Sequence, residues 1–314
     1  MKTRLYVGER LFSYGFPNHP LTPKRYEYFL SYLKEAKDLK GRLEIIHVDG
    51  VCRDESIVGL FHTEEYISRV KELSERGYGY IDYGDTPVFK GIYEVSIESV
   101  CVSAYGLEYA FENRCISVNL AGGWHHAFRD RGAGFCVFND IGVAIEYLRS
   151  RFGRDLVFYY IDIDAHHGDG VYYSYEEDPK VYIFDVHEDG RYLFPGTGFS
   201  WEVGKGEAKG TKINIPLHPW TGDEGLRSAV DKLVDSLRDV GPDIVIFQAG
   251  QDGLAGDPLT HLGYTDEGYL GAVARILEAV RGLKVGLLLL GGGGYQPDRV
   301  ARNWVKVLRI AVGL

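Results

Sequence analysis

The sequence lacks any run of 18 apolar residues, so it predicts no transmembrane helix. Its first residues, MKTRLYVGERLFSYGF, also lack the apolar segment of a signal peptide. Positive charge is not in excess, because the formal net charge of the 314-residue chain is −10 and no basic stripe is present. This balance argues against nucleic acid or an anionic membrane as the main partner. Linkers and internal repeats are absent too, which favours one domain over residues 1–314.

Cysteine is scarce. The chain has four, without a CxxC pair: Cys52, Cys101, Cys115 and Cys136. This pattern predicts reduced thiols rather than a disulfide framework or a zinc ribbon. Reduced thiols and the lack of a targeting segment together predict a cytoplasmic protein. Nothing in the sequence indicates its oligomeric state.

Short apolar runs alternate with longer amphipathic stretches along the chain. Eight β-branched or continuously apolar runs predict strands at 4–8, 43–48, 115–120, 156–164, 181–186, 212–217, 243–250 and 284–292. Helical patterns lie at about 22–38, 63–76, 92–113, 139–152, 223–240, 266–281 and 297–313. Such alternation is typical of right-handed βαβ units. We therefore expect an α/β three-layer sandwich, with a mainly parallel sheet of about eight strands between helices.

Polar motifs accompany the ends of five of these strands. They read NLAGGWHHAF at the strand 115–120, DAHHGDG at 156–164, DVHEDGRYLFPGTG at 181–186, GQDGLAGDP at 243–250 and GGGGYQP at 284–290. In open parallel sheets, active sites form beyond the carboxyl ends of the strands. We therefore predict that these five loops build one site.

The motif DIDAHHGD indicates a metal site. Asp162, Asp164 and His166 have i, i+2, i+4 spacing and would point the same way if extended backbone persists through the strand end. We predict that Asp164 and His166 bind one cation, with Asp252 of QAGQDG as the third ligand. One histidine and two aspartates leave an open coordination position, the layout of a catalytic metal site. Asp162 and Asp169 are then available to orient one histidine each.

Two further motifs carry candidate catalytic groups. His125 and His126 follow a Gly-Gly turn and could be metal ligands, but beside an activated water they suit general base and acid work better. The GGGGYQP motif has neither GxGxxG spacing nor a following Lys-Ser/Thr, so it does not fit a nucleotide-binding loop. We predict a flexible turn that brings the Tyr295 hydroxyl to a reacting carbonyl as an oxyanion donor.

These motifs resemble the histone deacetylase family of metal-dependent deacylases, within the arginase/deacetylase fold. The resemblance runs from HPLTPKR (19–25) to GGGGYQPDRVARNW (291–304) and rests on GGWHHA, GFCVFND, DIDAHHGDGV, FPGTG, GDPLTHL and GGGGY. Within the family, HEDGRYLFPGTGF, GDTPVFKGIYE and DPLTHLGYT are most similar to the prokaryotic acetoin-utilisation deacetylase branch.

The resemblance implies a cofactor and a second cation. Zn²⁺, or alternatively Fe²⁺, would be held by Asp164, His166 and Asp252. A monovalent cation, usually K⁺, is implied as a structural or modulatory ion near Asp162, Asp164, His166 and Asp185. The family usually has serine where Asp185 stands, so this cation site differs in one ligand.

The resemblance also implies catalytic roles. His126 would be the main general base and acid, oriented by Asp169. His125, paired with Asp162, would assist electrostatically. Tyr295 would donate a hydrogen bond to the carbonyl oxygen of the substrate.

A narrow tunnel for an acyl-lysine side chain is implied as well. Its residues would be Phe135 and Phe194 as walls with Gly134 beside them, Asp85 at the rim, Leu259 at a gatekeeper position, and Arg25 in an inner cavity connected with acetate release.

The predicted function is therefore removal of acetyl or acyl groups from lysine side chains of proteins, releasing acetate by attack of a zinc-activated water. One alternative is a deacetylase of acetylpolyamines or other small acylated amines, although neutral Leu259 offers no charge for a second ammonium. A catalytically silent acyl-lysine binding module is the alternative outside enzymes. A binuclear ureohydrolase of the related arginase branch is disfavoured, because Gly168 stands where its D-x-H-x-D motif needs the last aspartate.

Overall fold

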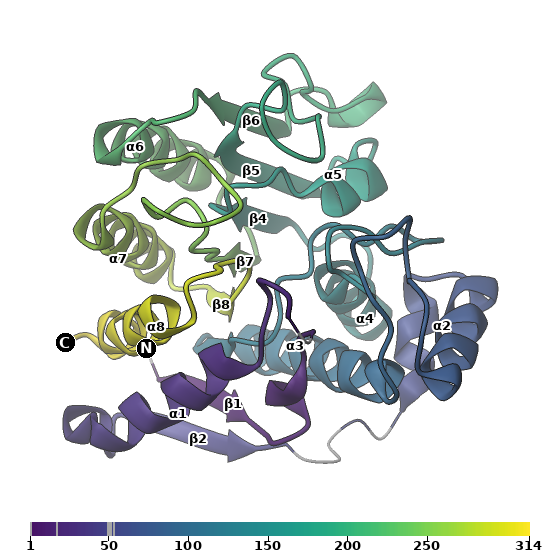
Figure 1. Ribbon diagram of the computed structural model, residues 1–314. Coiled ribbons are helices and arrows are strands. Elements are labelled where there is room, and N and C mark those ends of the chain that lie inside the picture. Colours follow the sequence, from purple (N-terminus) through teal and green to yellow (C-terminus); the bar gives the residue numbers. More distant parts are fainter. Residues whose placement is uncertain (1, 17, 49–51, 53) are drawn as a thin grey trace.

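The computed structural model describes residues 2–16, 18–48, 52 and 54–314. Their strands form one sheet of eight parallel strands, in the order β2-β1-β3-β8-β7-β4-β5-β6 (Figure 1). The strands are β1 Thr3–Val7, β2 Leu43–His47, β3 Ile116–Asn119, β4 Phe158–Asp162, β5 Val181–Glu188, β6 Lys212–Leu217, β7 Ile244–Gln248 and β8 Gly286–Leu290. All eight lie within two residues of a predicted start, and the predicted α/β three-layer fold is confirmed.

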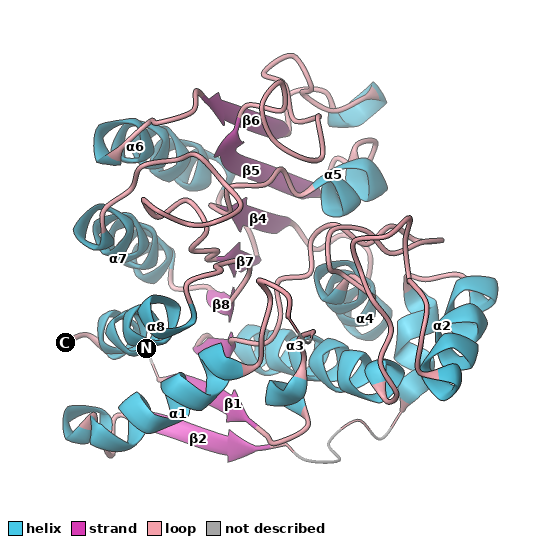
Figure 2. Ribbon diagram, viewed as in Figure 1, coloured by secondary structure: helices cyan, strands magenta, loops and turns pink. Residues whose placement is uncertain are grey.

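Helices cover both faces of the sheet (Figure 2). On one face lie α1 Lys24–Glu35, α6 Asp223–Val240, α7 Asp266–Leu283 and α8 Pro297–Val312. On the other lie α2 Glu64–Arg76, α3 Ile92–Asn113, α4 Asp140–Phe152 and α5 Asp169–Tyr175. Short 3-10 helices occur at Leu11–Ser13, Lys37–Leu39, Glu55–Leu60 and Gly206–Ala208. Helix α5 was not predicted, because its seven residues are too few to display a helical period. Among the described helices, none is long and apolar enough to cross a membrane.

Burial explains the composition of the strands. Every residue of β3, β4, β7 and β8 is buried, because helices cover both faces of the middle of the sheet. These strands are therefore almost continuously apolar rather than alternating. The two edge strands, β2 and β6, are partly exposed.

The strand order brings the five polar motifs together. The strands that carry them, β3, β8, β7, β4 and β5, are five consecutive strands in the sheet. The last residues of β3, β8, β7 and β4 are in register with one another and with Asp185 of β5, so that Asn119, Leu290, Gln248, Asp162 and Asp185 form one row across the sheet. Because all strands are parallel, the loops after this row leave from the same edge, as the sequence predicts.

The prediction of four reduced cysteines is wrong for two of them. Cys52 and Cys101 form a disulfide, with their Cα atoms 5.4 Å apart. The pairing joins residues 49 positions apart, across the packing of the 3-10 helix Glu55–Leu60 on α3, so spacing alone does not reveal it. Cys115 and Cys136 are free and buried. The disulfide removes one support for the predicted cytoplasmic location.

Candidate active site

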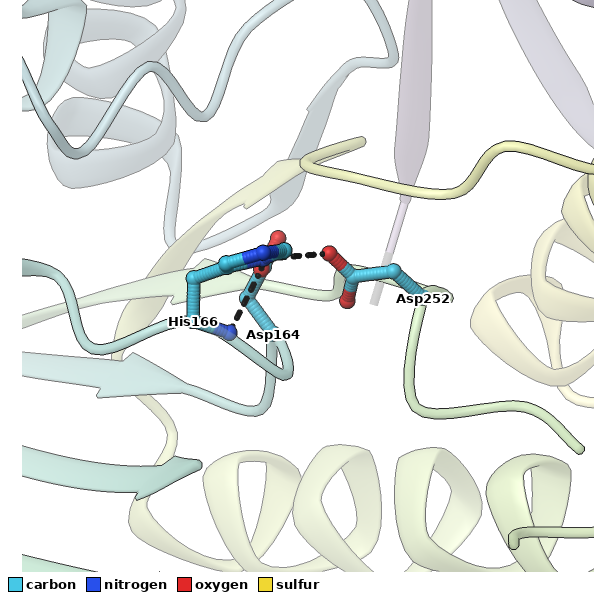
Figure 3. A group of neighbouring side chains, drawn as sticks. All are labelled: Asp164, His166 and Asp252. Atoms are coloured by element: carbon cyan, nitrogen blue, oxygen red, sulfur yellow. Dashed lines mark hydrogen bonds and ion pairs between the residues drawn. The ribbon is translucent and has the colours of Figure 1, made fainter. Parts of the chain in front are cut away.

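Three buried side chains meet at the centre of this edge. Asp164 and His166 lie in the loop after β4, and Asp252 lies in the loop after β7 (Figure 3). Each offers one ligand atom, and these atoms lie within 4.8 Å of one another. The Nδ1 atom of His166 is 2.9 Å from Asp252 Oδ2 and 3.2 Å from Asp164 Oδ1. The three predicted metal ligands therefore form a group that could hold one metal ion.

The chemistry of the group fits a divalent cation. Two carboxylates and one imidazole suit Zn²⁺ or Fe²⁺, and three protein ligands leave a position open. Without a cation between them, burial and the carboxylate of Asp164 raise the pKa of Asp252 to about 8. Bringing two carboxylates together in the protein interior is costly unless a positive charge compensates them. A bound divalent ion would supply that charge.

The remaining oxygen of each carboxylate is fixed by hydrogen bonds. Asp164 Oδ2 accepts from Gln248 Nε2 and from the backbone N–H of Gly293, both at 2.8 Å. Asp252 Oδ1 accepts from the N–H of Ala165 at 2.7 Å. Gln248 was not singled out from the sequence. It ends β7 one strand away from Asp162, and only the sheet order reveals that it faces the metal ligands.

Two histidines from the loop after β3 face the metal group. His125 Nδ1 lies 2.7 Å from Asp162 Oδ2, and His126 Nδ1 lies 2.7 Å from Asp169 Oδ1. The structure thus brings together both pairs that the family resemblance implies. With the Nδ1 atoms held by carboxylates, the Nε2 atoms are left to face the cavity.

The two histidines differ in charge. Burial opposes protonation of His125, but the carboxylates of Asp162 and Asp164 outweigh it and raise its pKa to about 10. Burial and the neighbouring His125 lower the pKa of His126 to about 4. At neutral pH, His126 is therefore a neutral base beside a protonated His125.

Asp140, at the start of α4, shapes the turn before these histidines. Its buried carboxylate accepts hydrogen bonds from the N–H groups of Gly123 and Trp124, at 3.1 and 2.8 Å, and from the Ser103 hydroxyl. Asp140 lies in the GFCVFND motif but was not assigned a role from the sequence. Its position next to Asn139, the N-cap of α4, was the available signal.

Tyr295 reaches the site from the loop after β8. Its N–H donates to Asp257 Oδ2 at 2.9 Å, and Asp257 Oδ1 accepts from the N–H of Leu259 at 3.0 Å. Burial raises the pKa of the Tyr295 hydroxyl well above its ordinary value, so the hydroxyl stays protonated. Asp257, which the sequence analysis did not identify, thereby fixes two lining residues at once.

Two cavities meet at this group. The outer one, of about 230 Å³, is lined by Asp85, His126, Gly134, Phe135, His166, Leu193, Phe194, Leu259 and Tyr295. The inner one, of about 40 Å³, is smaller and contains Arg25 among its lining residues. Five residues line both: His126, Gly134, Phe135, His166 and Tyr295. All the predicted substrate-binding residues lie in these linings, and Leu193 is the outer-cavity residue that the sequence analysis missed.

The guanidinium of Arg25 is buried at the inner cavity. Its Nη1 donates to the carbonyl oxygen of Gly292 at 3.0 Å, and its Nη2 donates to the Tyr26 hydroxyl at 2.7 Å. The Nε atom is buried without a hydrogen-bond partner among the described residues. A small anion such as acetate is the kind of ligand that an incompletely paired guanidinium binds.

Asp185 is surrounded by hydrogen-bond donors. Its Oδ1 lies 2.6 Å from His187 Nδ1, and its Oδ2 accepts from the N–H of Gly168 at 2.8 Å. Despite burial, Asp185 raises the pKa of His187. This residue pairs with an imidazole where the family usually has serine, and the implied K⁺ site stays a prediction.

Gly134 is expected not to tolerate a side chain. Its φ is +51°, and a Cβ atom would lie 2.4 Å from His126 Cδ2. We expect Gly134→Ala to lower kcat/KM about 10²-fold, because small displacements of a catalytic group cost that much. Gly41→Ala is the matched control, since Gly41 also has a positive φ of +79° but has no atom within 4 Å of such a Cβ. Equal activity of the two variants would contradict the close contact with His126.

His62 supports the loop that carries His125 and His126, and it makes the stability of the fold depend on pH. Its Nε2 accepts from the N–H of Asn139 at 2.9 Å, and Asn139 Nδ2 donates to the carbonyl oxygen of Ala127 at 2.8 Å. Burial lowers the pKa of His62 to about 3. In the unfolded chain the pKa of this histidine is about 6.5, so as the pH falls the unfolded state binds a proton that the folded state does not. The free energy of unfolding therefore decreases below about pH 6.5.

We expect the titration of His62 alone to lower the free energy of unfolding by about 2 kcal/mol when the pH falls from 7 to 5. Urea denaturation at the two pH values would show a smaller decrease for His62→Gln, whose amide can accept the same hydrogen bond without titrating. Equal decreases for both proteins would show that His62 titrates normally.

Comparison with known proteins agrees with this geometry. The family model described as histone deacetylase domain matches residues 19–311. The acetoin utilization protein AcuC of Bacillus subtilis is 37% identical over 268 residues, which cover 81% of this chain and 68% of that protein. The histone deacetylase RPD3 of Saccharomyces cerevisiae is 34% identical over 303 residues, 93% of this chain and 67% of that one. A crystal structure of a histone deacetylase homologue from Aquifex aeolicus superposes with a TM-score of 0.87 at 30% identity, covering 100% of this chain and 84% of that one.

Proposed function

Because the chain belongs to the histone deacetylase family, we propose that it is a zinc-dependent amidohydrolase that removes acetyl groups from lysine side chains of proteins. One observation carries the proposal: His166 of the metal-binding group, a neutral His126 and the Tyr295 ring line the same cavity. Zn²⁺ is favoured over Fe²⁺ by its prevalence in three-ligand hydrolytic sites of this type. We also propose that the protein acts in the cytoplasm.

The geometry supports a separate chemical role for the metal ion, for His126 and for Asp169. When bound, the metal ion supplies a Lewis acid that polarises the acyl oxygen and lowers the pKa of the attacking water. His126 accepts the proton of that water at Nε2, because its own Nδ1–H is held by Asp169. The same nitrogen then donates the proton to the leaving lysine amine. Asp169 holds the tautomer and the ring orientation that both steps need.

Two further residues stabilise the negative charge that develops on the acyl oxygen. The Tyr295 hydroxyl donates a hydrogen bond to the oxyanion and stays protonated because burial raises its pKa. Protonated His125, anchored on Asp162, adds a fixed positive charge behind the reacting atoms. The His125 ring is held by Asp162 and the Tyr295 backbone by Asp257 before the substrate arrives, which reduces the reorganisation needed during the reaction.

The outer cavity supports an acyl-lysine substrate. Phe135 and Phe194 give it apolar walls suited to the methylene chain of lysine, and Asp85 at its lining offers a carboxylate for the substrate backbone. The alternative is a small acylated amine such as an acetylpolyamine. Leu259, at the gatekeeper position, is neutral and gives such a substrate no counter-charge for a second ammonium.

Acetate release tests the proposal. Metal-loaded protein is incubated with an acetyl-lysine peptide and with acetylspermidine, and free acetate is measured with and without a chelator. We expect chelator-sensitive release with a higher kcat/KM for the peptide. A higher kcat/KM for acetylspermidine would support the small-amine alternative, and chelator-sensitive binding without any acetate release would support a silent binding module.

A further inference from the structure

Exposed aromatic side chains gather around the mouth of the outer cavity. The mouth residues Asp85, Leu193, Phe194 and Leu259 lie on three separate loops. Four aromatic residues exposed by 46% or more are mouth residues or lie within five positions of one in the chain: Tyr80, Tyr83, Tyr192 and Phe194. A fifth, Trp220, contacts His261 on the loop of Leu259. We name this set the aromatic rim. Exposed apolar surface of this kind marks an interaction site, because it is unfavourable in water unless a partner covers it.

Trp220 is the largest exposed member of the rim and is firmly attached to it. The residue is 76% exposed, and its backbone N–H donates to the carbonyl oxygen of His261 at 2.8 Å. The Trp220 and His261 rings lie with their centroids 5.9 Å apart. His261 follows the mouth residue Leu259 by two positions, so these contacts join Trp220 to the loop that lines the outer cavity.

His261 is in turn anchored on the sheet. Its N–H and its Nδ1 both lie 2.8 Å from the carboxylate of Glu188, a buried residue that ends β5. Trp220 also has a φ of +69°, a left-handed conformation that costs a non-glycine residue free energy. A bulky exposed ring is thus presented on a backbone held by specific contacts. Such rigid aromatic surfaces bind partners at low entropic cost.

The rim would contact a polypeptide substrate more extensively than a small acylated amine. An acetylated small amine would be taken up by the outer cavity of about 230 Å³ and would leave Trp220 in water. A polypeptide that inserts one acetyl-lysine must lay its neighbouring residues across the mouth. Its basic side chains would find an aromatic face on Trp220 and a protein of net charge −10.

We propose that Trp220, supported by His261, is a subsite for the residue that flanks the acetyl-lysine of a polypeptide substrate, with a preference for arginine or lysine there. This inference rests on the proposed deacetylase function and names its substrate class as polypeptide. The subsite lies outside the reacting centre and acts on substrate binding.

Matched substrates and variants test it. The substrates are a peptide with arginine on both sides of the acetyl-lysine, the same peptide with glutamate there, and a single acetyl-lysine with blocked termini. The proteins are wild type, Trp220→Ala, Trp220→Phe and Phe152→Ala. Phe152 is an exposed aromatic residue at the end of α4, before β4 and so at the opposite edge of the sheet.

We expect Trp220→Ala to raise KM for the arginine peptide about 5- to 30-fold with kcat unchanged, the loss that corresponds to one cation–aromatic contact. The ratio of kcat/KM for this peptide to that for blocked acetyl-lysine should fall by the same factor. Trp220→Phe should restore most of the ratio, and Phe152→Ala should leave both substrates unaffected.

Equal losses on the peptide and on blocked acetyl-lysine would overturn the subsite, because they would indicate a structural role for Trp220. A wild-type preference for the glutamate peptide would overturn the stated chemistry. If wild type released acetate from acetylspermidine but from neither lysine substrate, the substrate class itself would be wrong. If it released no acetate at all, the proposed function would fail instead.

Discussion

A Tyr295→Phe variant is expected to release acetate from an acetyl-lysine peptide with kcat lowered about 10²–10³-fold and KM little changed. The Tyr295 side chain lines the cavity together with His126 and His166, where the acyl group would lie. Its hydroxyl interacts with the oxygen only once negative charge develops there. Removing it therefore costs stabilisation of the transition state rather than of the bound substrate. Steady-state kinetics with metal-loaded protein measures the effect.

The matched control is Tyr264→Phe. Tyr264 is fully buried near Asp252, and its hydroxyl has no hydrogen-bond partner among the described residues. Removing this hydroxyl should leave kcat within about twofold of wild type, because no interaction is lost. If Tyr295→Phe were as active as Tyr264→Phe, Tyr295 would not be the oxyanion donor. If both variants lost activity alike, packing rather than hydrogen bonding would be responsible.

The sequence contained most of the fold because the strands in the middle of the sheet are covered on both faces. Continuous apolar runs such as IVIFQ at β7 and GLLLL at β8 follow directly from that burial. The polar motifs at their ends were predicted to converge because parallel strands end at one edge. The metal-ligand group was predictable for a similar reason, since Asp164 and His166 are neighbours along the chain and need only one further ligand.

The interactions that the sequence did not reveal connect different strands. Gln248 fixes Asp164 from the neighbouring strand, and Asp257 fixes Tyr295 from another loop. Neither contact leaves a local spacing, because each depends on which strands are adjacent in the sheet. The Cys52–Cys101 disulfide was missed because it depends on the packing of the 3-10 helix Glu55–Leu60 on α3 rather than on any local spacing. Helix α5, which begins at the end of the metal motif, was missed because its seven residues are too few to display a helical period.

Loss of one metal ligand should abolish activity. We expect Asp252→Asn, or wild type after treatment with a chelator, to release acetate at least about 10³-fold more slowly, because a Lewis acid supplies several kcal/mol of transition-state stabilisation. Elemental analysis should find one metal ion per chain in wild type and little in the variant. Two ions per chain in wild type would contradict a mononuclear site.

Asp243→Asn is the matched control for this substitution. Asp243 precedes the same strand, β7, at the opposite edge of the sheet, where its Oδ2 accepts from the N–H of Val157. The asparagine side chain can still accept that hydrogen bond. This variant should bind one metal ion per chain and retain activity, so that a loss confined to Asp252→Asn reports on the metal group.

Thermal stability supplies a second readout, because Asp252→Asn should not lower the Tm of the metal-free protein but should remove the rise in Tm that Zn²⁺ causes in wild type. In the metal-free protein, burial and the carboxylate of Asp164 raise the pKa of Asp252, so its ionised form is unfavourable there. At pH 7 the metal-free carboxyl is therefore mostly neutral, and an amide at position 252 resembles this neutral form while keeping the hydrogen bond to Ala165. Metal-free Asp252→Asn should melt no lower than metal-free wild type. Added Zn²⁺ should raise the Tm of wild type, because it binds only the folded state, but should leave the Tm of the variant nearly unchanged. An equal rise in both proteins would mean that the ion binds elsewhere and that Asp252 is not its ligand.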